Sequence, residues 1–209
     1  MRPRNLNLFL VGFFFLLVFF FFSLLEAKGV FQALDLGLTS FLQRFVPRFF
    51  DVPLSFFTLL GGIEITTLFL GFLFYYIRRR DKISLFSLGL FGLMMLLEMA
   101  EKFLIYHPGP PKIFFRYALP FTVPEYIASR YSFPSGHVAR TTFLAVVSSF
   151  LILRHLENKT LQKIILTVIV IFSLLMMVSR VYLGAHWSSD VFGGSLIGTG
   201  MAFLAMVYY

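Results

Sequence analysis

The chain has 209 residues, of which 58% are hydrophobic and only 13% are charged, and 30 of them are phenylalanine. A water-soluble domain of this length cannot bury so much apolar side chain, so the composition excludes a soluble globular protein and predicts an integral membrane protein. The formal net charge of +8 does not indicate nucleic-acid binding, because the basic residues stand at segment ends and among aromatic residues, without a basic stripe. Cysteine is absent, which excludes disulfides, thiolate metal sites and a cysteine nucleophile.

Six apolar segments are long enough to cross a bilayer, which takes about 20 residues. The first is too long for the core of a typical secretion signal and is not followed by a small-residue cleavage site, so we expect a retained helix. No internal repeat or low-complexity linker divides the chain. The sequence therefore predicts one all-α domain over residues 1–209, a bundle of six transmembrane helices. These segments cover about 6–25, 54–77, 83–105, 135–154, 163–183 and 189–209.

The segment 28–50 has an amphipathic pattern. Polar residues from Lys28 to Gln43 recur at spacings of three and four, and apolar residues fill the opposite side. This pattern predicts a helix lying on the membrane surface, ended by Pro47 or Pro53. A loop plug packed on the helix bundle is the alternative.

The loop 106–134 contains six of the nine prolines and several aromatic residues. Proline cannot continue a helix, so one long helix is excluded, and the loop is too apolar to extend freely into water. We predict that it folds as a lid over the outer mouth of the bundle.

Basic residues cluster tightly in 2–4, 78–82 and 154–163, which the predicted spans place on one side of the membrane. The other side has as many basic residues, but they are spread over longer loops or lie within motifs. Because cytoplasmic loops are enriched in Lys and Arg, we expect both termini in the cytoplasm and the two long loops outside.

Three polar stretches fall on the predicted outer face. "EMAEKFLIYHPGPP" ends the third span, "SFPSGHVAR" opens the fourth, and "SRVYLGAHWSSD" joins the fifth and sixth. Polar and charged groups are costly within a membrane domain, so their convergence predicts a functional site. The acidic residues Glu64, Glu98 and Glu101 are interpreted as supporting groups within the spans, and His107 and His155 as loop or interface histidines.

A phosphate site is the chemistry that these residues favour. Ser135 is placed to cap the fourth helix and Gly136 to let an anion approach its free N–H groups, with His137 projecting at the same place. Lys102 and Arg180 are cations at the ends of two further helices, suited to phosphate oxygens.

The other histidine of the site, His186, lies four residues before Asp190, so on a helix the carboxylate can hold the imidazole. A histidine oriented in this way is a plausible nucleophile. The unpaired His137 is then a plausible proton donor to the leaving oxygen.

"PSGH" at 134–137 and "SRVYLGAHWSSD" at 179–190 resemble the second and third motifs of the type 2 phosphatidic-acid phosphatase superfamily. The six-span layout with an outer amphipathic segment resembles the bacterial integral-membrane lipid phosphatases of that family. The resemblance implies hydrolysis through a phosphohistidine, without metal or cofactor. The implied roles are His186 as nucleophile, Asp190 as its orienting group, His137 as the acid, and Lys102, Ser135, Gly136 and Arg180 as phosphate ligands.

The first motif departs from the family pattern, which is Lys, six residues, Arg, Pro. Counted from Lys102, the arginine position holds Gly109, followed by the expected Pro110. We hypothesise that Arg140, one helical turn below His137, supplies the missing cation. Pairing of Lys102 with Glu98 and of Arg140 with Glu64 are the structural alternatives. The rival cations lie in the lid: Lys112, Arg116 and Arg130.

The sequence thus predicts a lipid phosphatase of the bacterial inner membrane, with its site on the periplasmic side and its substrate entering sideways from the bilayer. The substrate candidates are lipid A 1-phosphate, undecaprenyl diphosphate, phosphatidylglycerophosphate and phosphatidic acid. Transfer of the phosphate to a second lipid is one alternative. A non-catalytic lipid-binding scaffold or transporter is another. The oligomeric state is left open.

Overall fold

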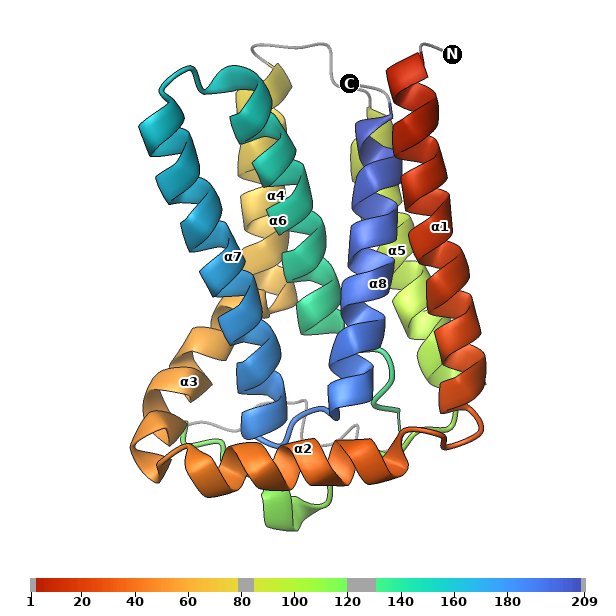
Figure 1. Ribbon diagram of the computed structural model, residues 1–209, viewed down its shortest axis with the longest axis vertical. Coiled ribbons are helices and arrows are strands. Elements are labelled where there is room, and N and C mark those ends of the chain that lie inside the picture. Colours follow the sequence, from red (N-terminus) through yellow and green to blue (C-terminus); the bar gives the residue numbers. More distant parts are fainter. Residues whose placement is uncertain (1–2, 79–84, 120–130, 208–209) are drawn as a thin grey trace.

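The structure is a computed structural model that describes residues 3–78, 85–119 and 131–207, and it is all-α, as predicted (Figure 1). Short 3-10 turns cover Arg48–Phe50, Leu59–Gly61 and Lys112–Phe114. The α-helices in the described residues are α1 (Pro3–Glu26), α2 (Gln32–Phe45), α3 (Asp51–Thr58), α4 (Ile63–Arg78), α5 (Leu85–Leu104), α6 (Gly136–His155), α7 (Lys159–Tyr182) and α8 (Ser188–Met206).

In the part of the chain that the structure describes, four stretches of helix are long and apolar enough to cross a membrane: Asn5–Glu26, Gly136–His155, Lys159–Tyr182 and Ser188–Met206. The bent pair of Arg48–Gly61 and Ile63–Tyr75 makes a fifth if it counts as one span. Helix α5 occupies the predicted third span and has three charged residues near its end, Glu98, Glu101 and Lys102. The structure therefore supports four to five candidate spans where the sequence predicts six.

The predicted span 54–77 corresponds to this bent pair and is not one straight helix, because Arg48–Gly61 and Ile63–Tyr75 meet at an angle of 49°. Gly61 lies against the active-site end of α6, where a Cβ atom would stand 2.9 Å from the ring of His137. Its carbonyl oxygen accepts a hydrogen bond of 3.2 Å from Arg140. The break thus brings bare backbone into contact with two predicted site residues.

Helix α8 lies at the centre of the bundle and packs against α1, α5 and α6. It approaches α6 so closely that a side chain at Gly194 or Gly198 would strike the α6 backbone region at Ser135 or Ala139. This tight packing fixes the beginning of α8 beside the beginning of α6. Both predicted histidine motifs lie there.

Helix α2 crosses the end of the bundle, opposite the end at which α1 begins and α8 stops (Figure 1). The predicted helix is present, but its polar side faces inward: Asp35 and Thr39 are buried, whereas Leu34, Phe41 and Phe45 are exposed. It contacts α7 and α8. The segment is therefore a helix, as predicted, and not the alternative loop plug, but it packs its polar side on the bundle and turns its apolar side outward.

The described part of the 106–134 loop runs over the turn between α7 and α8. The amide of Gln43 on α2 donates to the carbonyl oxygens of Phe114 and Tyr182, at 2.6 and 2.8 Å. Gly184 has φ +69°, and a Cβ atom there would collide with the Phe114 carbonyl. The glycine thus permits both the turn and the close approach of the loop. Residues 120–130 of the predicted lid lie outside the described residues.

Candidate active site

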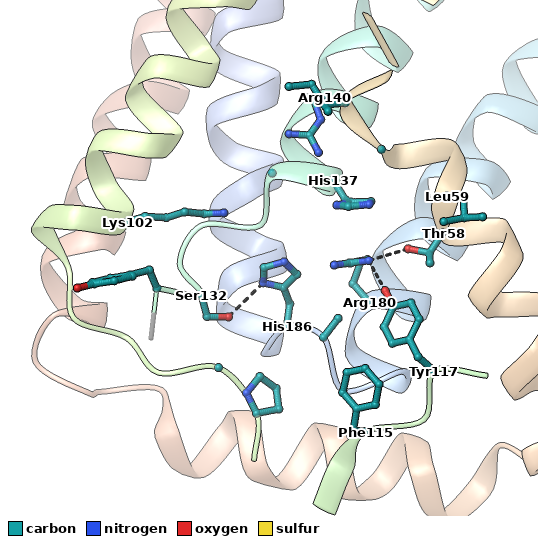
Figure 2. Close-up of a pocket in the computed structure, with 18 of the residues that line it drawn as sticks. Thr58, Leu59, Lys102, Phe115, Tyr117, Ser132, His137, Arg140, Arg180 and His186 are labelled. Carbon is teal, nitrogen blue, oxygen red and sulfur yellow. Dashed lines mark hydrogen bonds between the residues drawn. The ribbon is translucent and has the colours of Figure 1, made fainter. Parts of the chain in front are cut away.

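A cavity of about 870 Å³ opens near the end of the bundle that α2 crosses (Figure 2). Its wall comes from the α3–α4 break, the ends of α5 and α7, the first turns of α6, the turn before α8 and the loop after α5. The three polar stretches of the sequence therefore meet in one cavity, with Ser135 and Asp190 fully buried. The other predicted site residues line it: Lys102, Gly136, His137, Arg140, Arg180 and His186.

His186 is held by a carboxylate from the first turn of α8. Its Nδ1 lies 3.2 Å from Oδ2 of Asp190, which also accepts a 2.8 Å hydrogen bond from the backbone N–H of Trp187. Asp190 is completely buried, so its orientation is set by protein groups alone. With Nδ1 engaged by the carboxylate, Nε2 is the ring nitrogen available to a ligand in the cavity.

Ser132 is a further contact of this pair that the sequence analysis missed. Its hydroxyl lies 3.1 Å from Nδ1 of His186 and donates a short hydrogen bond to Oδ2 of Asp190. It is in a loop, where neither helical spacing nor a motif position singles it out. Only its place two residues before "PSGH" could have drawn attention to it.

The surroundings of His186 favour its neutral form. Burial lowers the pKa of the imidazole, and the positive charges of Arg180 and Lys102 lower it further, against the opposing hydrogen bond and charge of Asp190. The net result is a pKa below the ordinary value. A neutral imidazole keeps the lone pair that a nucleophile requires.

His137 and Arg180 face the same space as His186 (Figure 2). His137 is in the first turn of α6, where the helix N-terminus favours a bound anion. Arg180 is 1% exposed, at the end of α7. Its guanidinium donates to Oγ1 of Thr58 at 2.9 Å and to the hydroxyl of Tyr117, whose ring centroid is 5.8 Å away. These contacts hold the cation in a fixed direction.

Glu98 stands between two of the predicted phosphate-binding cations. Nζ of Lys102 is 2.8 Å from its Oε1, and a terminal guanidinium nitrogen of Arg140 is 3.6 Å from its Oε2. The pairing of Lys102 with Glu98 is thus present, in a position where Lys102 still lines the cavity. Arg140 is also bonded to the Gly61 carbonyl, which aims its guanidinium at the cavity.

The beginning of α6 has the predicted open backbone but not the predicted cap. Ser135 is the N-cap residue, yet its side chain makes no capping hydrogen bond, and its Oγ has no hydrogen-bond partner among the described residues. Its backbone N–H donates to the carbonyl of Asp190 at 2.9 Å. A Cβ atom at Gly136 would collide with the Glu98 carboxylate. That carboxylate therefore lies where the sequence predicts a bound anion.

The rivals of Arg140 are distributed differently. Gly109 and Lys112 line the cavity. Arg116 instead holds α2, because its guanidinium donates to the carbonyl oxygens of Gln43 and Val46 at 2.6 and 3.3 Å. Arg130 lies outside the described residues.

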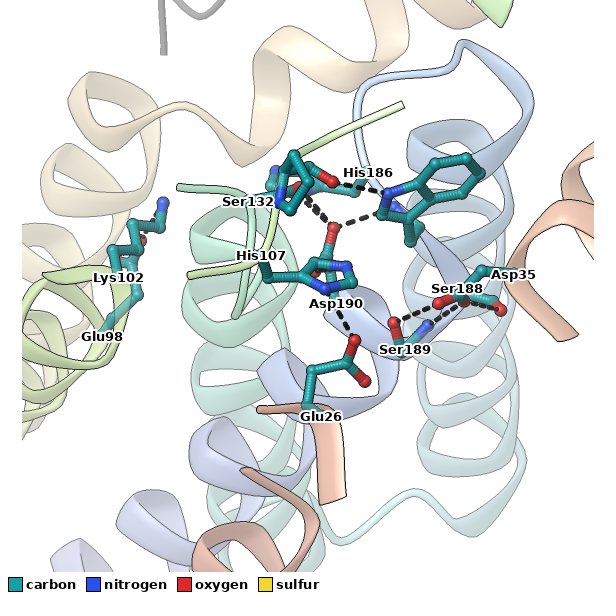
Figure 3. Close-up of polar contacts among 12 residues, drawn as sticks. Glu26, Asp35, Glu98, Lys102, His107, Ser132, His186, Ser188, Ser189 and Asp190 are labelled. Carbon is teal, nitrogen blue, oxygen red and sulfur yellow. Dashed lines mark hydrogen bonds and ion pairs between the residues drawn. The ribbon is translucent and has the colours of Figure 1, made fainter. Parts of the chain in front are cut away.

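A third buried histidine, His107, lies behind Asp190 (Figure 3). His107 has Nδ1 2.8 Å from Oε1 of Glu26, at the end of α1, and Nε2 3.4 Å from Oδ1 of Asp190. A series of side-chain contacts, Glu26–His107–Asp190–His186, therefore connects the first helix with the cavity. The interpretation of His107 as a loop or interface histidine did not include this contact.

The sequence suggests no acidic cluster suited to a metal ion, yet Glu26, Asp35 and His107 lie with one ligand atom each within 4.8 Å of one another. Both carboxylate oxygens of Asp35 already accept hydrogen bonds from the beginning of α8. The donors are Ser188 Oγ at 2.6 Å and Ser189 N and Oγ at 2.8 and 2.7 Å. We interpret the cluster as part of a hydrogen-bonded network around the beginning of α8.

Comparisons with known proteins agree with this architecture. Phosphatidylglycerophosphatase B of Bacillus subtilis (strain 168) is 35% identical over 77 residues, which span 36% of this chain and 38% of that protein. The crystal structure of the first transmembrane PAP2 type phosphatidylglycerolphosphate phosphatase from Bacillus subtilis has a TM-score of 0.73 at 23% identity, covering 94% of each chain. That of Aquifex aeolicus LpxE has a TM-score of 0.63 at 24% identity, covering 84% of this chain and 96% of that one.

At these identities the two structures show a shared fold. The family is shown by the sequence itself, because the model of the PAP2 superfamily matches residues 83–209. That range includes both histidine motifs and most of the cavity wall. This membrane protein belongs to the PAP2 superfamily.

Proposed function

We propose that the protein is a membrane lipid phosphatase that works through a phosphohistidine and needs no metal ion. One observation carries this proposal: two histidines face one cavity together with cations, and a buried carboxylate supports one of them. His186 is backed by Asp190, and His137 stands across the cavity beside Arg180. This arrangement provides a nucleophile, a proton donor and charge stabilisation for a phosphoryl group.

In the first step, Nε2 of His186 attacks phosphorus while the bond from phosphorus to the leaving oxygen breaks. His137 gives that oxygen its proton. The imidazolium-like phosphohistidine is stabilised by Asp190, which accepts the Nδ1 proton in a hydrogen bond. In the second step, His137 takes a proton from water, the resulting nucleophile attacks phosphorus, and the bond to His186 breaks to release inorganic phosphate.

The phosphoryl oxygens are bound by cations and by the beginning of α6. Arg180 is held rigidly, and Lys102 and Arg140 approach from the opposite wall. Ser135 and Gly136 contribute the helix N-terminus, whose N–H groups favour an anion. We assign to Arg140 the charge that the family pattern places at Gly109.

A second, mostly apolar cavity supports a lipid substrate. It has about 1030 Å³, lies between α4, α6 and α7, and shares Ile65 with the first cavity. Its lining extends from Leu60 to Asn158, between opposite ends of the bundle. A hydrocarbon chain attached to a phosphate in the first cavity can therefore continue into an apolar groove, which a water-soluble phosphate ester would leave empty.

We further propose that the cavity opens at the outer face of a bacterial inner membrane. Arg154, Lys159 and Lys163 lie near the opposite end of the bundle, and such clusters mark cytoplasmic ends. Because the chain has no cysteine, Asn158→Cys introduces a single label site. A membrane-impermeant maleimide should modify it only after the membrane is broken. Labelling in intact cells would reverse the orientation.

The function is tested by phosphate release in detergent micelles containing EDTA. The panel contains phosphatidylglycerophosphate, phosphatidic acid, undecaprenyl diphosphate and lipid A 1-phosphate, and the similarity to the Bacillus subtilis enzyme makes the first of these the leading candidate. Each lipid is incubated with wild type and His186→Ala. We expect release by wild type from at least one lipid and loss of at least about 1000-fold in the variant.

Two results would contradict the proposal. Release that survives His186→Ala would exclude this nucleophile. Absence of release from all four lipids would exclude the assigned activity, and would favour a lipid-binding scaffold or transporter. Recovery of the phosphate on a second lipid, instead of in solution, would identify a phosphotransferase that uses the same histidine.

A further inference from the structure

His107 and Glu26 form a buried pair directly behind the proposed nucleophile. Glu26 is the last residue of α1 and is 2% exposed, and His107 follows α5 and is 5% exposed. The backbone of His107 is also fixed, because its carbonyl accepts from the N–H of Ser132 at 2.9 Å. Glu26 lies outside the stretches on which the site was predicted, and His107 lies within the first of them without having been assigned a role in the site.

His107 lies between two buried carboxylates. Nδ1 is 2.8 Å from Glu26, and Nε2 makes an ion-pair contact of 3.4 Å with Asp190, longer than an ordinary hydrogen bond. Burial alone would lower the pKa of His107, but the contact with Glu26 and the negative charges of Asp190, Glu26 and Asp35 outweigh it and raise the pKa. A protonated His107 offsets the negative charge of both carboxylates, which is costly to bury, although its Nε2 and Asp190 Oδ1 make no hydrogen bond within the described residues.

The two oxygens of Asp190 are consequently bound on opposite sides. Oδ2 contacts His186, Ser132 and the Trp187 N–H, whereas Oδ1 faces His107. We propose that His107, anchored by Glu26, is a positioning residue that fixes the orientation and charge of Asp190 and thereby of His186. This inference rests on the proposed phosphatase function and extends its machinery to the first helix.

The charges around His186 determine how the loss of His107 should change the protonation of His186. His186 faces Asp190 from α8, Arg180 from α7, His137 from α6 and Lys102 from α5. His107 adds positive charge on the far side of Asp190. Without it, the Asp190 carboxylate is less compensated and favours a protonated His186. The pH below which the nucleophile is lost then rises.

The test compares His107→Gln and Glu26→Gln with wild type. Glu101→Gln is the matched control, because Glu101 is another buried carboxylate that interacts with α1, at Ser23, and does not line the cavity. We expect kcat to fall about 10- to 100-fold in both test variants, with KM little changed. The acid limb of kcat/KM should move up by about one pH unit for His107→Gln. The control Glu101→Gln should keep the wild-type kcat and the wild-type acid limb of kcat/KM.

A purely structural role gives a different pattern. If the variants lose thermal stability while kcat and the acid limb stay within about twofold and 0.2 pH units of wild type, the proposal is wrong. The double variant adds a check, because two residues acting as a unit should together cost no more than His107→Gln alone.

A readout that needs no turnover separates this inference from the proposed function. Diethyl pyrocarbonate reacts with neutral imidazole, so the pH dependence of His186 modification, followed by peptide mass spectrometry, reports its protonation. We expect His107→Gln to move that curve to higher pH even if no lipid of the panel is hydrolysed. Superimposable curves for wild type and variant would overturn the assignment.

Discussion

Glu98→Gln tests the role of the Glu98 carboxylate, which lies against Gly136 and between the cations Lys102 and Arg140. A bound substrate phosphate must compete with the Glu98 carboxylate for these two cations. Two negative groups about 4 Å apart repel by about 4 kcal/mol at an effective dielectric of ~20. The side chains of Glu98 and Lys102 are 10% and 27% exposed, so solvent and relaxation offset most of this repulsion. About 1.4 kcal/mol should remain, a tenfold change in affinity.

The assay is inhibition of phosphate release by orthovanadate or inorganic phosphate. We expect Glu98→Gln to bind either anion about tenfold more tightly, because the amide keeps the shape of the side chain without its charge. Glu101→Gln makes the same change of net charge on the same helix and should leave the inhibition constant unchanged. Weaker anion binding in Glu98→Gln would refute the reasoning, and would show that the carboxylate serves to organise Lys102 and Arg140 for the substrate.

Three further outcomes are expected. Arg140→Ala should lower kcat/KM by about 10- to 100-fold, and activity within about threefold of wild type would disprove the assignment of Arg140 as a phosphate ligand. Arg116→Ala removes contacts between the 106–134 loop and α2, so it should mainly lower the melting temperature. The pKa of His186 lies below its ordinary value of 6.5, so the acid limb of kcat/KM, on which Nε2 becomes protonated, should lie below that value. An acid limb that already begins above pH 7 would contradict this. Ala145→Phe, which fills the apolar cavity, should reduce hydrolysis of long-chain lipids more than of a short-chain analogue; equal losses would argue against a tail site.

Much of the site could be predicted because its parts are local in sequence. His186 and Asp190 are four residues apart, and the α8 helix turns that spacing into a 3.2 Å contact. The length of the apolar segments likewise predicts α1, α6, α7 and α8, because each is long and apolar enough to be a candidate membrane span. Where one element determines the geometry, the sequence is sufficient.

The missed features depend on contacts between distant segments. Glu26 meets His107 across 81 positions of the chain, and no periodicity links them. The break at Gly61 is hidden in an apolar run that reads as one helix; its cause is the fit of bare backbone against His137 and Arg140 on α6. Such features follow from how helices pack, which pattern reasoning along one segment does not include.

Helix α2 shows how the site can determine the orientation of a surface element. An amphipathic helix normally turns its polar side to water, but here Asp35 points inward and accepts hydrogen bonds from the first two residues of α8, Ser188 and Ser189. That turn precedes Asp190 directly. Because the polar stripe is used to fix the beginning of α8, the apolar side with Phe41 and Phe45 must face outward, where a membrane interface can cover it. The position of Asp190 and the outward orientation of the apolar side of α2 are therefore set by the same helix.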